Sequence, residues 1–164
     1  GIALGRNPVA VARRAIRMGL GQSFTRMQTI SRTEMLRTYR VTTQTAYQNS
    51  NVVVGYRRLS ARDDRTCPGC LMADGRFYPL GTNFEAHVNC RCALVPVLRN
   101  VPPVQFQTGQ EWFTQQPEAT QRRILGPGRY DAWQNGATLD DMVTVVPNAT
   151  WGDAIVPTRV RDLV

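Results

Sequence analysis

The sequence predicts an α+β protein with N-terminal helices, a small β-rich Cys/His core and an irregular helical C-terminal extension that ends in an extended arm. Three observations support this prediction. Apolar residues recur at helical spacing before residue 50, strand-forming residues cluster after it, and the segment 67–92 contains all four cysteines and the only histidine. We divide the chain into a helical part (1–50), the β-rich Cys/His core (51–99), a linker (100–108) and a C-terminal part (109–164).

A chain of 164 residues is long enough for one domain with a sizeable core. No apolar run approaches the ~20 residues that a transmembrane helix requires, so we expect no membrane partner. The first apolar stretch is interrupted by Arg13, Arg14 and Arg17, which is unlike a secretory signal. We therefore expect a reducing compartment, in which cysteines seldom form disulfides.

The first predicted helix spans 8–20, where apolar side chains recur every three or four residues and Pro8 suits the first turn. A second helix is predicted over 31–49, because Ser31 followed by Glu34 has the pattern of a capping box. The alternative is a single longer helix over 24–49, in which Ser31 is an interior residue.

A strand is predicted over 52–60, which is rich in valine and other strand formers. Asp74 and Gly75 form a turn signal followed by two aromatic residues, so we expect a hairpin turn there. Another strand is predicted over 90–98, where apolar residues dominate.

The segment 100–108 is predicted to be a linker, and the chain beyond it to form short helical pieces separated by proline and glycine. Thr138, followed three residues later by Asp141, predicts the start of one more short helix. From residue 143 to 164 we expect extended chain, as an arm that needs a partner.

Positive charge is concentrated in the first 65 residues, which contain twelve arginines and three acidic residues, whereas the rest contains eight arginines and nine acidic residues. There is no lysine, and the forked guanidinium of arginine suits contacts with phosphate or carboxylate. We therefore expect contacts with nucleic acid or an acidic protein surface. The alternative is a solvated helix face. The residues expected to make these contacts are Arg6, Arg13, Arg14 and Arg17.

The cysteines and the histidine form two ligand pairs. Cys67 and Cys70 form a C-x2-C pair, and His87 and Cys90 form an H-x2-C pair after sixteen intervening residues. Two pairs of this kind are typical of a structural tetrahedral zinc site, because each tight turn points two ligands at one metal. Cys92 is a fifth candidate that could replace Cys90 or His87, since alternate residues of a strand share a face. The alternative is a metal-free cluster of buried thiols or disulfides.

The evidence for catalysis is weaker. A catalytic zinc site keeps one position open beside a general base, and neither H-E-x-x-H nor H-x-E occurs in the sequence. A nuclease would use Asp63, Asp64 and Glu85 beside a metal, whereas acidic residues in turns are more often solvated. We therefore expect a non-enzymatic protein, with a metal-dependent nuclease or a zinc-ribbon nucleic-acid-binding module as the alternatives.

Several motifs follow one another in order: Arg32-Thr33-Glu34, Asp63-x-Arg65-x-Cys67-x-x-Cys70, Asp74-Gly75 and His87-x-x-Cys90-Arg91-Cys92. Over about residues 25–98 this order resembles the Mu F-like minor head proteins, the phage head morphogenesis family of tailed bacteriophages. The family usually has proline before the histidine, where this chain has Ala86. The segment 111–141 is similar to one that often follows in such proteins.

The resemblance implies a minor capsid protein of the virion, associated with the portal vertex or capsid interior, and present in the host cytoplasm during assembly. Its partners would be the portal protein, the major capsid protein and packaged DNA. Its role would be head morphogenesis, DNA packaging or DNA delivery. A suggested distant relationship of the family's fold to ADP-ribosyltransferases adds a transferase as a further alternative.

Structural roles are expected for residues around the cysteine cluster. Arg65 and Arg91 are expected to pair with Asp63 or Asp64 and hold the C-x2-C turn. Glu34 is expected to cap its helix, with pairing to Arg32 or Arg91 as the alternative. The complete set of expected structural residues is Glu34, Asp63, Arg65, Asp74, Gly75 and Arg91.

Overall fold

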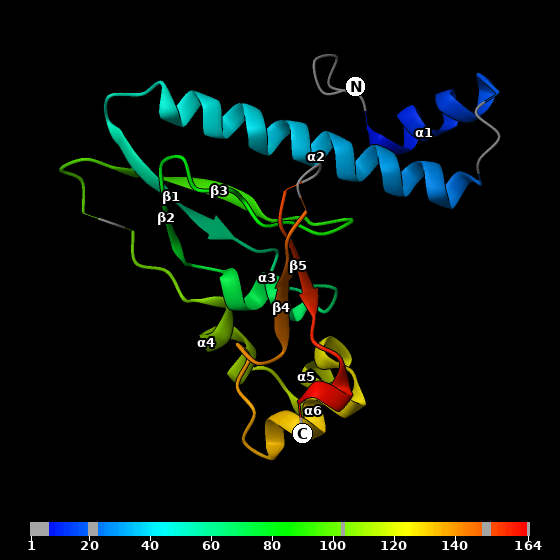
Figure 1. The fold of residues 1–164 in the computed structure, drawn as a ribbon, viewed down its shortest axis with the longest axis vertical. Coiled ribbons are helices and arrows are strands. Elements are labelled where there is room, and N and C mark those ends of the chain that lie inside the picture. The colour runs from blue at the N-terminus through cyan, green and yellow to red at the C-terminus, as the bar shows by residue number, and fades with distance from the viewer. Residues whose placement is uncertain (1–6, 20–22, 103, 149–151, 164) are drawn as a thin grey trace.

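The computed structural model describes residues 7–19, 23–102, 104–148 and 152–163. These residues form helices and two small antiparallel sheets, which confirms the predicted α+β class. A long helix lies along a three-stranded sheet at one end of the molecule, and short helices gather at the other end (Figure 1). In the described part of the chain, no helix combines the length and apolarity needed to cross a membrane.

The first two helices pack against each other and form a hairpin (Figure 1). In α1 (Pro8–Arg17), the Asn7 side chain accepts a hydrogen bond from the backbone N–H of Val9 at 2.8 Å and caps the helix. Its Ala12 is fully buried. The helix α2 (Phe24–Gln48) is much longer than α1 and continues past the hairpin to cover the sheet.

The predicted helix start at Ser31 is wrong, and the single longer helix is correct. Ser23 supplies the cap, because its hydroxyl accepts from the backbone N–H of Arg26 at 3.3 Å. Ser31 lies buried inside α2. Glu34 is therefore an exposed residue in the middle of a helix and not a capping residue. Among the described residues it has no ion pair with Arg32 or Arg91.

The larger sheet has the strand order β2-β1-β3, with β1 (Val53–Leu59) in the centre between β2 (Phe77–Pro79) and β3 (Ala93–Leu98). Both pairings are antiparallel. Tyr56 stacks on Tyr78 with ring centroids 5.3 Å apart, and Leu94 completes this small core. The sheet is attached to α2 by polar side chains as well, since Gln44 donates to the Tyr56 hydroxyl at 3.1 Å.

The expected hairpin turn at Asp74-Gly75 is wrong, because the connection from β1 to β2 contains the short helix α3 (Pro68–Ala73). Asp74 ends this helix and is buried. Its carboxylate accepts from the backbone N–H of Ser60 and from the Arg62 side chain, both at 2.7 Å. Gly75 has a φ of +82°, in the left-handed region that glycine adopts readily. The dipeptide thus forms a helix-to-strand turn.

The C-terminal part builds a second apolar core from three short helices: α4 (Gly109–Thr114), α5 (Glu118–Leu125) and α6 (Pro127–Gln134). Phe113 and Met142 are fully buried in this core, and Leu71 of α3 joins it. The helix expected at Thr138 is wrong. Thr138 and Asp141 do form reciprocal hydrogen bonds of 2.7 and 3.3 Å, but the chain continues as a turn.

The C-terminal arm is extended, and its strands pair with each other. The strands β4 (Val143–Val146) and β5 (Ala154–Pro157) form a two-stranded antiparallel sheet, which the 3-10 helix η2 (Val160–Asp162) follows. Ile155 is buried against Gly69 of α3. The arm therefore packs against α3 of the same chain. In Figure 1 it runs from the short helices toward α2.

Candidate metal centre

The C-x2-C pair lies at the start of α3. Cys67 is the N-cap residue, and its Sγ accepts a hydrogen bond from the backbone N–H of Cys70 at 3.4 Å. Pro68 occupies the first turn, where its missing N–H costs nothing. Because the helix begins at this point, both sulfur atoms lie on the same side of the turn.

The H-x2-C pair lies on a second tight turn, before β3. The backbone N–H of Cys90 donates to the carbonyl of His87 at 3.0 Å. Asn89 between them has a φ of +61°, which asparagine tolerates better than most residues. Its N–H donates to the Thr33 hydroxyl of α2 at 3.1 Å and so attaches the turn to the long helix. The strand predicted from Cys90 begins only after Cys92, yet both cysteines join the cluster.

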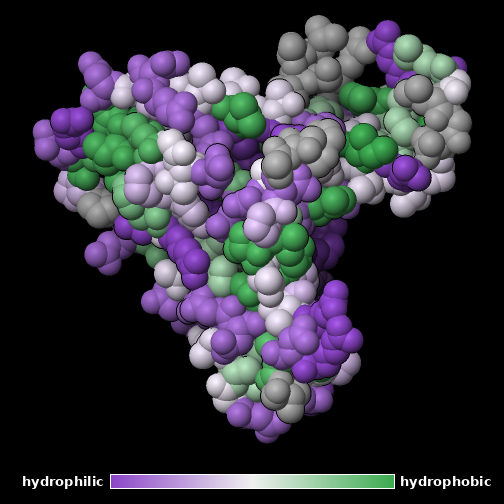
Figure 2. All heavy atoms as spheres, in the orientation of Figure 1, coloured by the Kyte–Doolittle hydropathy of each residue, from purple (hydrophilic) through white to green (hydrophobic). Residues whose placement is uncertain are grey.

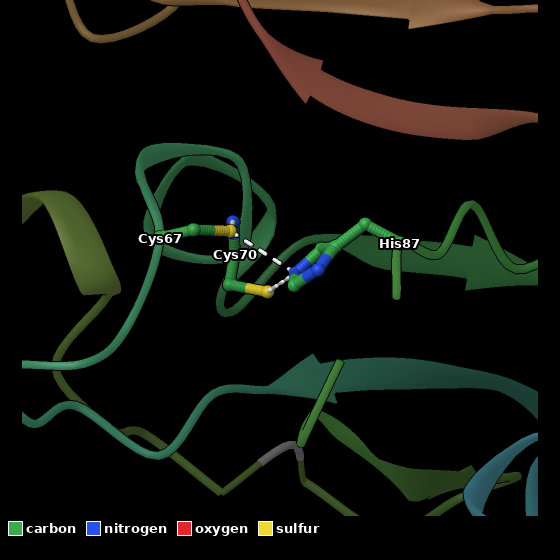
Figure 3. Close-up of side chains that lie close together, drawn as sticks. All are labelled: Cys67, Cys70 and His87. Atoms are coloured by element: carbon green, nitrogen blue, oxygen red, sulfur yellow. Dashed lines mark hydrogen bonds between the residues drawn. The ribbon is translucent and has the colours of Figure 1, made fainter. Parts of the chain in front are cut away.

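All five candidates come together. The Nε2 atom of His87 lies 3.1 Å from the Sγ atoms of both Cys67 and Cys70 (Figure 3). The Sγ atoms of Cys70 and Cys90 lie 3.9 Å apart. The ligand atoms form two groups, each within 4.8 Å: Cys67, Cys70 and His87 in one, and Cys70, Cys90 and Cys92 in the other.

These distances fit a metal better than a disulfide. Tetrahedral zinc with typical bond lengths separates two sulfur ligands by about 3.8 Å and a sulfur from a nitrogen by about 3.6 Å. A disulfide requires about 2.05 Å, and all four cysteines are free. A cavity of about 20 Å³, large enough for one ion or water, borders Cys67, Cys70, His87 and Cys92.

The orientation of the imidazole suits a ligand. The Nδ1 atom of His87 lies 2.7 Å from the backbone carbonyl of Val88. A proton on Nδ1 can be donated to this carbonyl, which leaves the Nε2 lone pair free to face the sulfur atoms. A hydrogen bond with Cys70 lowers the pKa of the Cys67 thiol to about 4, although burial opposes this shift.

Two buried arginines surround the cluster, and sequence analysis missed both. Arg58 of β1 is fully buried, and its Nη2 donates to the Sγ atoms of Cys70 and Cys90 at 3.5 and 3.6 Å. Its Nη1 donates to the carbonyl of Glu85 at 2.6 Å. Among the described residues, Arg58 has no carboxylate partner. The sulfur atoms of the cysteine cluster are therefore the side-chain acceptors that Arg58 contacts.

The second arginine, Arg40 of α2, is 3% exposed and donates to the backbone carbonyls of Cys90 and Cys92 at 3.2 and 3.5 Å. Both guanidinium groups lie over the ring of Phe84, Arg58 at 4.3 Å and Arg40 at 5.1 Å from its centroid. Burial lowers the pKa of Arg40. Burial also lowers the pKa of Arg58, but negative charge on the neighbouring cysteines outweighs this and raises it above its ordinary value.

One sequence signal could have identified Arg58. Alternate residues of a strand share a face, so Arg58 lies on the same face of β1 as the buried Tyr56. An arginine that points into the core needs a buried partner for its charge. The cysteines, which are expected to be buried, were the candidate partners.

The acidic residues near the cluster form ion pairs. The two carboxylate oxygens of Asp63 accept from Arg91 at 2.6 Å each, and this interaction lowers the pKa of Asp63 well below its usual range. The exposed Arg65 lies 3.8 Å from the same carboxylate. Asp64 pairs with Arg123 of α5 at 2.8 Å. Among the described residues, no carboxylate belongs to either group of potential metal ligands.

Three of the four arginines expected to contact a partner lie on α1. Arg13, Arg14 and Arg17 are exposed on α1, and Arg6 lies outside the described residues. Arg13 also lies 5.9 Å from the ring centroid of Phe24 in α2. In Figure 2, the helical hairpin projects from the body of the molecule and carries hydrophilic side chains.

The sequence model of the family described as Phage Mu protein F like protein matches residues 1–95. The chain belongs to this family. The Mu F-like segment contains the helical hairpin, most of the larger sheet and all five candidate ligands. The Mu F-like proteins are phage head proteins, so the chain is a head morphogenesis protein. Searches of curated proteins and of solved structures each found no match.

Proposed function

We propose that this chain is a minor capsid protein at the portal vertex, where it acts without catalysis in head morphogenesis, DNA packaging or DNA delivery. The family match over residues 1–95 carries the proposal, because it covers both the basic hairpin and the Cys/His core. The proposed location is the capsid interior or portal vertex of the virion, and the host cytoplasm during assembly. The proposed partners are the portal protein, the major capsid protein and packaged DNA.

The Cys/His core is proposed to hold one structural zinc ion. The donor set supports this, since five soft ligands form two groups that share Cys70 beside a buried cation. The segment 87–92 contains no helix or strand, and 67–70 is the start of the short helix α3. A metal would join α3, the turn before β3 and β1 into one unit.

The helical hairpin of α1 and α2 is proposed to contact DNA or an acidic portal surface through its arginines. Arg13, Arg14 and Arg17 project from one short helix, and Arg6 precedes it. We retain the division into a helical part (1–50), the Cys/His core (51–99), a linker (100–108) and a C-terminal part (109–164). In this division, the first part makes contacts and the second gives it a rigid base.

Quantitative mass spectrometry of purified phage particles tests the proposal. We expect this chain in a few copies per particle, close to the copy number of the portal protein. A matched comparison uses particles assembled with the Arg13→Ala, Arg14→Ala, Arg17→Ala variant and with an Arg159→Ala, Arg161→Ala variant. The first should be incorporated less, and the second normally. Absence of the unmodified chain from particles would contradict the proposal.

A further inference from the structure

We propose that the metal centre is a three-thiolate, one-imidazole site formed by Cys67, Cys70, His87 and Cys90, that Arg58 is its buried counter-charge, and that Cys92 is a thiol beside the site and not a ligand. This inference rests on the proposed zinc ion and assigns its ligands. Five donors lie in the cluster, whereas a structural zinc ion takes four.

Contacts of Cys70 favour this set. The Sγ atom of Cys70 lies 3.1 Å from the Nε2 atom of His87 and 3.9 Å from the Sγ atom of Cys90, and Cys67 lies 3.1 Å from the same nitrogen. Cys70 therefore links the group that contains His87 to the group that contains Cys90. Arg58 donates to the sulfur atoms of Cys70 and Cys90.

The backbone favours the same four ligands. Cys67 and Cys70 are held by the N–H to sulfur bond at the start of α3, and His87 and Cys90 by the N–H to carbonyl bond of their turn. Cys92 lies outside both turns. It does border the small cavity, whereas Cys90 does not, so the competing assignments place Cys92 in the position of Cys90 or of His87.

Charge separates a three-thiolate site from the four-thiolate site that has Cys92 in place of His87. Three thiolates around a divalent zinc ion leave a single negative charge, whereas four thiolates leave two. Arg58 is fully buried and is the guanidinium that reaches the sulfur atoms. Arg40 binds neutral backbone carbonyls instead. Since a buried charge is costly without a partner, one contacting guanidinium matches the three-thiolate centre.

Cobalt(II) substitution in the full chain tests the ligand assignment. The near-ultraviolet charge-transfer band of tetrahedral cobalt grows with the number of thiolate ligands. Cys90→Ser and Cys92→Ser are a matched pair, because the same buried residue type is changed two positions apart. We expect Cys92→Ser to keep the full intensity and Cys90→Ser to lose about a third of it. Equal losses in the two variants, or a larger loss in Cys92→Ser, would overturn the assignment.

A second measurement uses the unmodified chain, so its result does not depend on whether a variant folds. The cadmium-113 chemical shift of the cadmium-loaded chain distinguishes three sulfur ligands and one nitrogen from four sulfur ligands. We expect the three-sulfur value, and a four-sulfur value would overturn the assignment. A chain that binds neither cobalt nor cadmium would overturn the zinc proposal itself, together with this inference.

The counter-charge role of Arg58 is tested separately, by competition with a metal-binding dye. Arg58→Met keeps the length of the side chain but removes its charge, and we expect about 10- to 100-fold weaker zinc binding with an unchanged cobalt spectrum. Arg58→Lys should restore part of the affinity. Arg57→Met, on the opposite face of β1, is the control. Unchanged affinity in Arg58→Met would overturn this role.

Discussion

The backbone N–H of Ala86 donates a hydrogen bond to the carbonyl of Asp153 at 3.2 Å, and the Ala86 carbonyl accepts from the N–H of Ile155 at the same distance. These two bonds join the residue before His87 to β5. Proline, which the family resemblance led us to expect here, cannot make the first of them. The arm is thus attached directly to the segment that carries a candidate ligand.

Ala86→Pro should therefore loosen β5 while the Cys/His core stays folded. We expect a loss of about 1 kcal/mol in the free energy of unfolding, because one backbone hydrogen bond is removed. Amide hydrogen exchange should show faster exchange at Ile155. Ala86→Ser keeps the N–H and is the control. Unchanged protection of Ile155 in the proline variant would show that this bond does not hold the arm.

The ion pair of Asp63 with Arg91 predicts a pH-dependent contribution to stability. The pKa of Asp63 is lowered in the folded chain, so its contribution is present above the unfolded pKa near 4 and is lost as the pH falls through the folded value. The carboxylate is partly exposed, so we expect Asp63→Asn to cost only about 1 kcal/mol at pH 7.

Urea unfolding of both chains between pH 7 and pH 3 checks this prediction. The difference in unfolding free energy should shrink as the pH falls below about 4. Because metal release at low pH affects both chains alike, the difference isolates Asp63. A difference that is constant over the whole range would show that the ion pair contributes nothing.

The start of α2 predicts contrasting effects of two polar substitutions. Ser23→Ala removes the N-cap and should lower the free energy of unfolding by about 1 kcal/mol. Glu34→Gln changes an exposed residue in the middle of the helix and should stay within about 0.5 kcal/mol of the unmodified chain. Thermal unfolding of both variants decides between the long helix and one that begins at Ser31. The reverse order of effects would favour the later start.

If the arginines of α1 contact DNA, the affinity of the chain for duplex DNA should fall as the salt concentration rises. If Arg13, Arg14 and Arg17 each neutralise one phosphate, their replacement by alanine should reduce the slope of log affinity against log salt by about 3. Fluorescence anisotropy at several salt concentrations measures this slope. Replacing Arg159 and Arg161 by alanine should leave it unchanged. Equal slopes for the unmodified chain and the triple variant would show that these arginines do not contact DNA.

The sequence was sufficient for features that depend on local patterns. The C-x2-C and H-x2-C pairs, the central strand and the basic first helix follow from spacing and composition. The sequence left two starts open for α2, one at Ser31 and one at residue 24 in a single longer helix. Only packing shows that Ser31 is buried against its surroundings.

Other features depend on contacts between distant segments, which one sequence does not reveal. The pairing of Ala86 with β5 joins residues far apart in the chain. The contact of Arg40 with the Cys90 carbonyl depends on where α2 crosses the sheet. Asp74 and Gly75 have the composition of a hairpin turn, yet Asp74 ends a helix and its buried carboxylate accepts from the backbone N–H of Ser60.

Zinc content tests the central claim most directly. Native mass spectrometry of the purified full chain, with elemental analysis, should find one zinc ion per chain and four unoxidised cysteines. Removal of the ion by a chelator should unfold the Cys/His core, because its thiolates and Arg58 then lose the metal that organises them. A zinc-free chain with the same thermal stability would contradict the account.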